Sequence, residues 1–421
     1  CSANLLFVNN GNFTFTESAS IYGLSDEGCA FAVAFTDFDN DNDVDLLLAN
    51  DFGEWVLPSA LYENQYPLSG FDNVSAEFQM DVEMYGMGIA IGDYDRDNDL
   101  DYYQTNIGRN FLSRNDGVIF EDVTTDANVE NDSLNGLNTT SWGCFFFDAD
   151  NDSWPDLFVA NGQLPMAPFL ANVTNDPNKL FLNNGDGSFS DISDNSGLSV
   201  TERSHGAICA DFDKDGRVDI VVSNNGVEVG DTRVYYHRNI SENVNHWVEF
   251  DLEGVQSNRD AYGSHVTVWL DGQPTLAEVD GGSSHASKNS SILHFGVGES
   301  MMVDSVNIVF PSGIATTLFD VAVDQRHSVV EDLAVDVTNE LIYNANLYFE
   351  MSESSLVLHS DINVKAVVEV FDLLGKVVWK SDETLQIGDN PLPNFRLGSS
   401  AYFVKAKTPF STTTLKFVNL P

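Results

Sequence analysis

Basic residues are scarce in this chain. Its 421 residues include 19 Lys and Arg against 65 Asp and Glu, so the formal net charge is -46 at pH 7. A field of that sign repels the phosphates of nucleic acids and anionic membrane surfaces, which argues against both as partners. It suits a protein that stays soluble in a salty, calcium-rich medium.

Long apolar runs and paired cysteines are also missing. No stretch of about 18 apolar residues occurs, so the sequence predicts no membrane-spanning helix. The four cysteines form no Cys-x-x-Cys pair, which argues against a zinc or redox motif. We expect Cys29, Cys144 and Cys209 to be buried free thiols, with a disulfide between neighbouring repeats as the alternative. Cys1 is either the acylated cysteine of a lipoprotein or simply the first residue of the sequence.

Signatures of catalysis are absent as well. The eight His residues show no metal-ligand spacing such as His-x-x-x-His, and Ser283-Ser284-His285 lacks the Gly-x-Ser-x-Gly pattern of a nucleophile elbow. Aromatic residues such as Trp55, Tyr62 and Tyr66 suggest a sugar-stacking surface, although packing between strands is the commoner use of aromatics. We therefore predict no enzymatic activity.

The chain is rich instead in aspartate, arranged in four nine-residue loops. These read DFDNDNDVD at 37–45, DYDRDNDLD at 93–101, DADNDSWPD at 148–156 and DFDKDGRVD at 211–219. Every copy has Asp at loop positions 1, 3, 5 and 9, and such close carboxylates repel one another unless a cation lies among them. Oxygen ligands at alternate positions favour calcium over magnesium, because calcium accepts a flexible shell of six to eight oxygens. An EF-hand is excluded, since no loop has Glu at position 12 and strand-like runs flank each one.

The loops belong to a repeat. They begin at residues 37, 93, 148 and 211, so the intervals are 56, 55 and 63 residues. An apolar stretch precedes each loop, and a run of β-branched and aromatic residues follows it, which indicates strands. A second motif, LLFVNNGNF at 5–13, NDGVIF at 115–120 and KLFLNNGDGSF at 179–189, indicates hairpin turns. Each repeat therefore predicts about four short strands, the content of one propeller blade.

These residues resemble the FG-GAP/VCBS family, whose calcium-loop repeats also build integrin α-subunit propellers. The resemblance spans residues 1–245 and implies a β-propeller-type region that binds about four Ca²⁺ ions. Position 7 varies, as expected if it offers its backbone carbonyl, but the extra Asp43 and Asp99 make the first two loops the candidates for the tightest sites. Trp154-Pro155 is a departure that either stiffens or weakens the third loop. The implied metal ligands are Asp37, Asp39, Asp41, Asp43, Asp45, Asp93, Asp95, Asp97, Asp99, Asp101, Asp148, Asp150, Asp152, Asp156, Asp211, Asp213, Asp215 and Asp219.

Two further segments follow the repeats. Residues 246–334, with HWVEFDLEG at 246–254 and LHFGVG at 293–298, resemble the ASPIC/UnbV domain and predict a compact β domain of about six strands. Residues 335–421, with VVEVFDLLGKVVW at 367–379 and LGSSAYFVKA at 397–406, resemble the C-terminal sorting domain of type IX secretion cargo in Bacteroidetes. That resemblance implies an Ig-like β-sandwich, contact with the type IX secretion machinery, and a location outside the cell or on the outer-membrane surface of a Gram-negative bacterium.

The sequence as a whole predicts an all-β, secreted, calcium-binding surface protein. We expect a scaffold for adhesion or assembly whose ligand is a surface glycan or protein. One alternative is a polysaccharide-active enzyme built on a propeller platform, with paired carboxylates in a cleft outside the four loops. The other is a subunit of an extracellular polymer that completes its first repeat with a strand from a neighbour.

Overall fold

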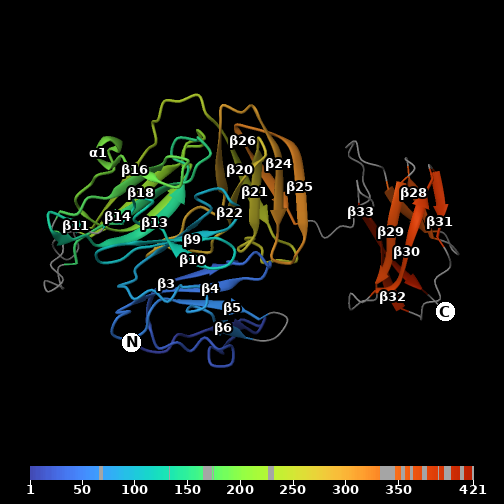
Figure 1. Cartoon of the computed structure of the whole chain (residues 1–421), viewed down its shortest axis with the longest axis horizontal. Helices are drawn as coiled ribbons and strands as arrows, with labels where there is room; N and C mark the ends of the chain where they lie inside the picture. Colours follow the sequence, from blue (N-terminus) through green and yellow to red (C-terminus); the bar gives the residue numbers. More distant parts are fainter. Residues whose placement is uncertain are drawn as a thin grey trace. The chain divides into compact units, whose positions relative to one another are not determined.

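The computed structural model of the chain describes residues 1–65, 70–131, 133–164, 173, 175–225, 232–331, 347–351, 356–360, 364–371, 377–386, 388–392, 400–407 and 412–419. The chain divides into two compact units, Cys1–Glu331 and Asp332–Pro421 (Figure 1). Almost every element is a β-strand, so the predicted all-β class is confirmed. Helix α1 (Ser193–Ser196) is a single turn, and none of the described helices is long and apolar enough to cross a membrane.

The first unit contains four antiparallel sheets in series, one for each Asp loop. The first sheet is β3 (Cys29–Thr36), β4 (Asp45–Asp51), β5 (Ala60–Asn64) and β6 (Phe71–Asn73). The second is β7 (Ile89–Gly92), β8 (Asp101–Gln104), β9 (Phe111–Asn115) and β10 (Phe120–Asp122). The third is β13 (Ser141–Phe147), β14 (Asp156–Asn161), β15 (Lys179–Asn183) and β16 (Phe189–Asp191). The fourth is β17 (Arg203–Ala210), β18 (Asp219–Asn225) and β19 (Thr232–His237). Each loop is the turn between the first two strands of its sheet.

Both faces of an interior sheet are apolar, because each is covered by a neighbouring sheet. In the third sheet Cys144 and Val159 pack in the core shared with the second sheet. Their neighbours Phe145 and Phe158 point the other way, into the core shared with the fourth sheet. Successive side chains of a strand alternate between its faces, so burial on both sides requires the continuous apolar runs seen in the sequence. The described residues stack in this way without forming a closed propeller ring.

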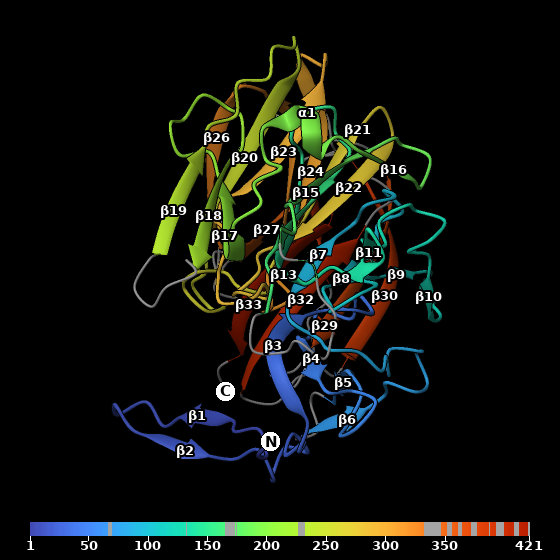
Figure 2. The ribbon, with the colours of Figure 1, turned by 90° about the vertical axis from the view of Figure 1, so that its left-hand side faces the viewer.

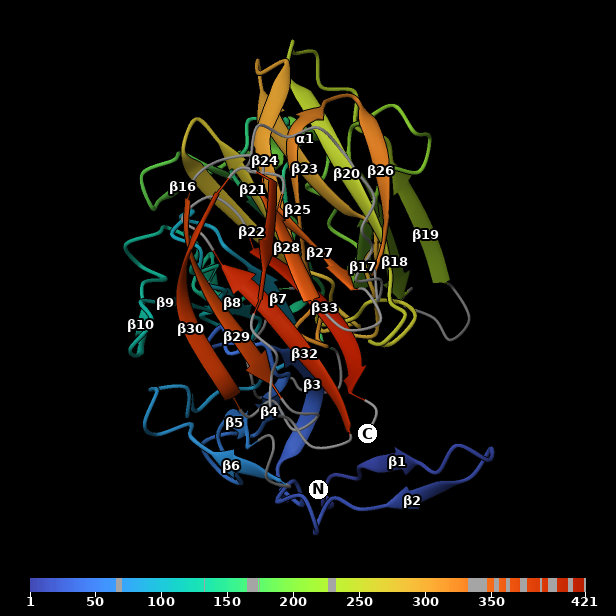
Figure 3. The same cartoon turned by 90° about the vertical axis from the view of Figure 1, so that its right-hand side faces the viewer.

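A two-stranded hairpin, β1 (Phe7–Asn9) with β2 (Phe15–Glu17), projects from the first sheet (Figures 2 and 3). A disulfide between Cys1 and Cys29 ties the start of the chain to β3. The expected free thiol at Cys29 is therefore wrong, and the bond is not the alternative link between neighbouring repeats. A sulfur in a disulfide also cannot carry a thioether-linked lipid. Cys144 and Cys209 are buried free thiols, as expected. A small hairpin, β11 (Ser133–Leu134) with β12 (Leu137–Asn138), precedes β13.

Residues 246–331 form what we call the β domain. Its strands are β20 (His246–Glu253), β21 (His265–Leu270), β22 (Gln273–Glu278), β23 (Leu293–Gly298), β24 (Met302–Val309), β25 (Ala315–Ala322) and β26 (Gln325–Val330). They make two sheets, ordered β23-β20-β26 and β22-β21-β24-β25, in which only the β20–β26 pair is parallel among the described strands. Val248, Phe250, Val266, Val306 and Ile308 are fully buried in the domain's core.

A segment of the β domain, residues 283–290, runs along the innermost strands of three repeat sheets. We call it the axial segment. The Ser283 carbonyl accepts the N–H of Ile89 in β7 at 3.2 Å. Ser284 Oγ accepts the N–H of Cys144 in β13 at 2.9 Å, and Asn289 Oδ1 accepts the N–H of Cys209 in β17 at 3.1 Å. Backbone groups at the inner edges of the sheets, which would be costly to bury unpaired, are thus satisfied by the β domain.

The second unit consists of two sheets. One has the order β27 (Leu347–Met351), β28 (Leu356–Ser360), β31 (Gly388–Pro391), and the other β30 (Val377–Leu385), β29 (Val364–Phe371), β32 (Ser400–Lys407), β33 (Thr412–Asn419). Val368, Val370 and Val404 are completely buried between strands of this unit. Residues 332–346 and the middle of the motif quoted at 367–379, residues 372–376, lie outside the described residues.

Candidate metal centres

The four Asp loops share one backbone conformation. Positions 4 and 6 adopt the left-handed region in every loop, with φ between 59° and 83°. The residues there are Asn40 and Asn42, Arg96 and Asn98, Asn151 and Ser153, and Lys214 and Gly216. Asn and Gly tolerate positive φ better than branched residues do, which explains their frequency at these positions. The two left-handed residues curl the chain so that three of its carboxylates approach one another.

The carboxylate at position 1 closes each loop through backbone hydrogen bonds. Asp37 accepts the N–H groups of Asp41 at 3.1 Å and Asn42 at 2.9 Å. Asp148 does the same with positions 5 and 6 of the third loop, at 3.1 and 2.8 Å, and Asp211 with those of the fourth, at 3.1 and 2.9 Å. Asp93 accepts the N–H of Asp97 at 3.0 Å. The same geometry in four copies means that the loop shape is encoded locally.

The carboxylate at position 9 joins the loop to the third strand of its own sheet. Asp156 accepts the N–H of Ala149, at position 2, and that of Asn183, at the end of β15, both at 2.8 Å. Asp45, Asp101 and Asp219 make the equivalent pairs of bonds, with Asn64, Asn115 and Asn239 as the strand-end donors. The carboxylate at position 9 therefore holds the loop to its sheet and is also a candidate metal ligand.

Three carboxylates of each loop converge, with ligand oxygens within 4.8 Å of one another. The clusters are Asp37, Asp39 and Asp41; Asp93, Asp95 and Asp101; Asp148, Asp150 and Asp152; and Asp211, Asp213 and Asp219. The other predicted ligands lie in the same loops but outside these trios, namely Asp43, Asp45, Asp97, Asp99, Asp156 and Asp215. Asp99 instead accepts a hydrogen bond from Asn40 Nδ2 at 2.7 Å. The Asp residues added at position 7 thus lie apart from the converging oxygens.

Burial raises the pKa of carboxylates in each of the first three loops. It raises the pKa of Asp37 to about 7 and that of Asp45 to about 8, and neighbouring carboxylates add to both shifts. Burial likewise raises the pKa of Asp93 to about 7 and that of Asp148 to about 8. An ionised carboxylate is costly to bury without a compensating charge. A cation among these oxygens would provide that charge.

The fourth loop differs, because two arginines already contact its carboxylates. Arg238 Nε lies 2.5 Å from Asp213 Oδ2, and its Nη2 lies 3.0 Å from Asp215 Oδ2. Arg217 also forms an ion pair with Asp215. Both guanidinium groups repel an incoming cation and occupy oxygens that it would use. The sequence showed Arg217 inside the loop but not Arg238, which reaches it from beyond β19.

The donor set fits calcium. The loops offer only oxygen ligands, and one carboxylate oxygen in each of the first three loops is buried without a hydrogen-bond partner. These atoms are Oδ1 of Asp43, Asp95 and Asp150. Hard cations such as calcium take six to eight oxygens at flexible angles, and carboxylates and backbone carbonyls are the ligands they prefer.

Position 4 of each of the first three loops contacts the next loop in the series. Asn40 contacts Asp99, as described above. The Arg96 guanidinium lies 4.9 Å from the centre of the Trp154 ring, and Asn151 Nδ2 donates to the Gly216 carbonyl at 3.0 Å. The partners occupy positions 6 or 7 of the following loop. The four loops therefore form one connected row.

That row of loops lies against the β domain. The Leu276 N–H of β22 donates to Asp93 Oδ2 at 2.9 Å, and Glu278 Oε1 accepts the N–H of Asp37 at 3.3 Å. Gly298 donates its N–H to the Asn151 carbonyl at 2.8 Å, and His294 Nε2 lies 3.0 Å from the Gly216 carbonyl. Every loop thus contacts a residue of β22 or β23.

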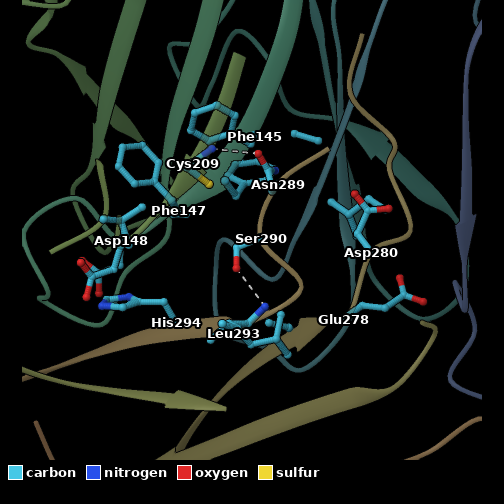
Figure 4. Close-up of a pocket in the computed structure, with 18 of the residues that line it drawn as sticks. Phe145, Phe147, Asp148, Cys209, Glu278, Asp280, Asn289, Ser290, Leu293 and His294 are labelled. Atoms are coloured by element: carbon cyan, nitrogen blue, oxygen red, sulfur yellow. Dashed lines mark hydrogen bonds between the residues drawn. The ribbon is translucent and has the colours of Figure 1, made fainter. Parts of the chain in front are cut away.

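A cavity of about 160 Å³ lies between the β domain and the third and fourth sheets. Figure 4 shows its wall, with Phe147, Cys209, Asn289, Ser290 and Leu293 around the open space. Asp148 and His294 lie together on one side, and Glu278 and Asp280 on the other. The carboxylates of Asp148 and Glu278 point away from the centre of the cavity, and Glu278 accepts the N–H of Asp37 in the first loop. The carboxylate of Asp280 accepts the N–H groups of Gly282 and Ser283 in its own turn.

Sequence reasoning missed the asparagines at the ends of the third strands. Asn115 Nδ2 donates to the Phe38 carbonyl at 2.8 Å, Asn183 Nδ2 to that of Tyr94 at 2.8 Å, and Asn239 Nδ2 to that of Ala149 at 2.7 Å. Each side chain thus bonds the backbone carbonyl at position 2 of the preceding loop, a contact that we call an asparagine clamp. The signal was the Asn that recurs before the turn, which the sequence alone explained as hairpin chemistry.

Of the aromatic residues named as a sugar-stacking surface, the two that the structure describes differ in exposure. Trp55 is 76% exposed, but Tyr62 is only 4% exposed and donates its hydroxyl to Asp26. Tyr66 lies outside the described residues. Packing within the first sheet accounts for Tyr62.

Two protein families match parts of the chain. The profile of the family described as ASPIC and UnbV matches residues 254–335, and that of the FG-GAP-like repeat matches residues 169–222. The first match covers most of the β domain, and the second covers the third-to-fourth repeat. Both agree with the resemblances drawn from the motifs.

Curated relatives give the same indication. Cartilage acidic protein 1 of Mus musculus is 24% identical over 286 residues, covering 66% of this chain and 41% of that protein. The protein of the same name from Xenopus tropicalis is 24% identical over 318 residues, covering 73% of this chain and 45% of that protein. The chain thus spans less than half the length of these relatives. With the two profiles, they indicate an extracellular, β-rich protein.

Among solved structures, a glycoside hydrolase is similar at 11% identity, with 92% of this chain and 97% of that chain covered. The TM-score is 0.27, so this likeness supports no argument about fold or activity.

Proposed function

We propose that this chain is a secreted calcium-binding scaffold for adhesion or assembly, in which about four Ca²⁺ ions fix the repeat sheets to the β domain. The observation that carries the proposal is the row of four equivalent loops. Each has converging carboxylates, and each contacts the β domain directly. A bound ion would therefore hold the two parts of the unit together as well as shape one hairpin.

The protein's own groups prepare the sites. Backbone N–H groups orient the carboxylates at positions 1 and 9, so their oxygens are placed before any ion arrives. When bound, calcium supplies the positive charge that the buried carboxylates of the first three loops lack. The Asp residues at positions 1, 3, 5 and 9 of each loop are the proposed ligands, with Asp43 and Asp99 as additional candidates. Arg217 and Arg238 make the fourth site the weakest.

Calorimetric titration of the metal-free chain tests this proposal. Calcium should bind at about four sites, one for each cluster, and magnesium should bind more weakly because it demands a stricter geometry. Asp95→Asn should reduce the stoichiometry by about one site, since it weakens the second loop alone. Asp186→Asn, in an exposed hairpin turn, is the matched control and should leave the stoichiometry unchanged. A metal-free chain that binds no calcium would refute the proposal.

We also propose export by the type IX route and display outside a Gram-negative, Bacteroidetes-like cell. The support is the resemblance of residues 335–421 to the sorting domain, together with the extracellular indication from the relatives. Deleting residues 335–421 in such a host should leave the protein inside the cell, as fractionation and immunoblotting would show. Unchanged surface display of the truncated chain would contradict this route.

The proposed ligand is a surface glycan or protein, and the scaffold role assigns no catalytic residue. Pull-down on native cell surfaces followed by mass spectrometry would identify what binds. Incubation with marine and plant polysaccharides gives the opposing result if products appear, because turnover would favour an enzyme over a scaffold.

A further inference from the structure

A small group of buried side chains lies between the first Asp loop and the β domain. Two of them, His265 and Glu278, are directly paired across strands β21 and β22. Paired residues of an antiparallel sheet place their side chains on the same face, with Cβ atoms about 4.5–5.5 Å apart. That face is turned toward the loops, because Thr267, two residues along β21, donates its hydroxyl to Asn98 of the second loop. The β domain thus presents an imidazole and a carboxylate side by side.

The first loop adds Asp37 to this group. The backbone N–H of Asp37 donates to Glu278 Oε1 at 3.3 Å, and its Oδ2 lies 4.0 Å from His265 Nε2. The same Nε2 lies 3.9 Å from Glu278 Oε1. One imidazole nitrogen is therefore about equally near to the carboxylates of two other side chains. We call His265, Glu278 and Asp37 the interface triad.

The separations around His265 Nε2 are too long for hydrogen bonds, which join nitrogen and oxygen at about 2.7–3.2 Å. His265 Nε2 and Glu278 Oε2 are both buried and have no hydrogen-bond partner within the described part of the chain. The Glu278 side chain is fully buried, and only 10% of the His265 side chain is exposed. Buried polar atoms are nearly always paired, so these two atoms indicate a ligand between the first loop and the β domain.

The interface triad also lacks positive charge. Among the described residues, no Lys or Arg forms an ion pair with Asp37 or Glu278. Burial raises the pKa of Glu278 well above its usual range and lowers that of His265 to about 4, so the imidazole is neutral at pH 7. A neutral imidazole has one ring nitrogen with a free lone pair. A buried water would pair the polar atoms without adding charge, whereas a metal ion would bind the lone pairs and compensate the carboxylates.

We propose that the interface triad binds a metal ion of a second type, a divalent transition ion such as Zn²⁺. Its ligands are His265 Nε2, Asp37 Oδ2 and a carboxylate oxygen of Glu278. Asp37 has two carboxylate oxygens, so it can bind this ion and the calcium ion of the first loop at the same time. The site adds a second metal to the calcium scaffold, and it does not require that the loops bind calcium.

The nitrogen ligand distinguishes this site from the four loops. Calcium and magnesium prefer oxygen ligands, whereas imidazole together with carboxylates suits zinc. Zinc binds these groups at about 2.0–2.2 Å, which keeps neighbouring ligands of a tetrahedral ion roughly 3.3–3.6 Å apart. The distances of 3.9 and 4.0 Å around His265 Nε2 are only slightly longer. Small rotations of the three side chains would therefore bring them onto one ion.

An ion at the interface triad would link the first repeat to the β domain. Asp37 follows β3, while His265 and Glu278 belong to β21 and β22, and Asp37 and Glu278 are 241 positions apart in the chain. These ligands are together only in the folded chain, so the ion binds the native state in preference to the unfolded state. Zinc should therefore raise the unfolding temperature of the first unit when calcium is held constant.

Equilibrium dialysis of the full chain against zinc, in excess calcium, tests this site, with the bound metals counted by elemental mass spectrometry. The unaltered chain should retain about one zinc ion, and its calcium content should stay the same. His265→Gln should lose the zinc ion and keep its calcium. His327→Gln, in β26, is the matched control and should still bind zinc, because its ring lies beside the Ala322 carbonyl and away from the triad.

X-ray absorption at the zinc edge provides a measurement that needs no variant. The spectrum of the zinc-loaded, unaltered chain should show one imidazole among nitrogen and oxygen ligands, and no sulfur. Thermal unfolding in calcium shows whether His265→Gln is folded. If it is not, the spectrum alone decides whether His265 can be a ligand, because the alternative carboxylate sites would give oxygen ligands only.

Three results would overturn the proposal. A folded chain that takes up no zinc excludes the site. Equal zinc uptake by His265→Gln, or a spectrum without imidazole, assigns the ion to other carboxylates. Release of one calcium ion for each zinc ion bound means that zinc enters the first loop instead of a separate site. None of these results decides whether the loops bind calcium, which titration of the metal-free chain measures independently.

Discussion

Glu331 shows how this acidic chain keeps a buried carboxylate ionised without a metal. Its Oε2 accepts the N–H groups of Val255, Gln256 and Ser257 at 2.6 to 2.7 Å, and its Oε1 accepts the hydroxyls of Ser257 and Ser312. Burial alone would raise its pKa. The hydroxyl of Ser312 and the surrounding N–H groups outweigh burial and lower the pKa to about 2.

A stability change with pH follows from Glu331. Its pKa is lower in the folded state than the ordinary 4.5, so the ionised form stabilises the fold above pH 4.5. That contribution is lost as the pH falls from 4.5 to about 2. We expect Glu331→Gln to lower the free energy of unfolding by about 3 kcal/mol at pH 7. The difference from the unaltered chain should shrink below pH 4.5, as urea titrations at several pH values would show. A difference that is constant with pH would mean that the shape of the side chain matters and not its charge.

Arg238 provides a second test at the level of single residues. Because its guanidinium occupies oxygens of Asp213 and Asp215, Arg238→Gln should raise the calcium affinity of the fourth loop about two- to fivefold, as expected for an exposed ion pair. Calorimetric titration measures the change. Arg233→Gln, which lies within β19 and is paired with Glu202, is the control and should leave calcium binding unchanged. Equal effects of both substitutions would point to net charge as the cause.

At the scale of elements, the asparagine clamps hold neighbouring sheets in register. Asn183→Ala removes one buried and two partly buried hydrogen bonds, and the buried one is to the Tyr94 carbonyl. We therefore expect it to reduce the free energy of unfolding by about 1–3 kcal/mol. Asn184→Ala, one residue on in an exposed turn, should cost much less. Urea unfolding of both variants measures the difference. Similar losses would show that turn formation dominates at both positions.

The sequence predicted the strands and loops better than it predicted the contacts between them. The Asp loops and the strands beside them follow from local patterns, and the structure has each loop as the turn between two paired strands. The contacts of Asn183 with Tyr94, of Leu276 with Asp93, and of Cys1 with Cys29 join residues distant in the chain. An Asn before a glycine turn has the same local pattern whether or not its side chain bonds a neighbouring sheet. Those contacts were therefore beyond prediction from motifs.

At the scale of the whole molecule, the repeat sheets and the β domain should unfold together. They share the loops and the axial segment, and they form one compact unit, while residues 332–421 form another. Under the calcium proposal, a chelator should lower the transition of the first unit by about 10–20 °C, if four ions contribute near saturation. The transition of the second unit should stay in place. Differential scanning calorimetry with and without EDTA would show this, with added magnesium as the control. An unchanged first transition would mean that the loops are rigid without metal.

The axial segment also imposes an order on biosynthesis. The backbone N–H groups of Ile89, Cys144 and Cys209 bond to residues 283–290, which follow much later in the chain. A ribosome adding roughly 5–20 residues per second needs on the order of 10–40 s to pass from Ile89 to that segment. During this interval the nascent repeats have bare inner edges, which are open to chaperones and prone to mispairing. The unit therefore reaches its native state late, and under the proposed export route this delay would keep the chain unfolded until it is translocated.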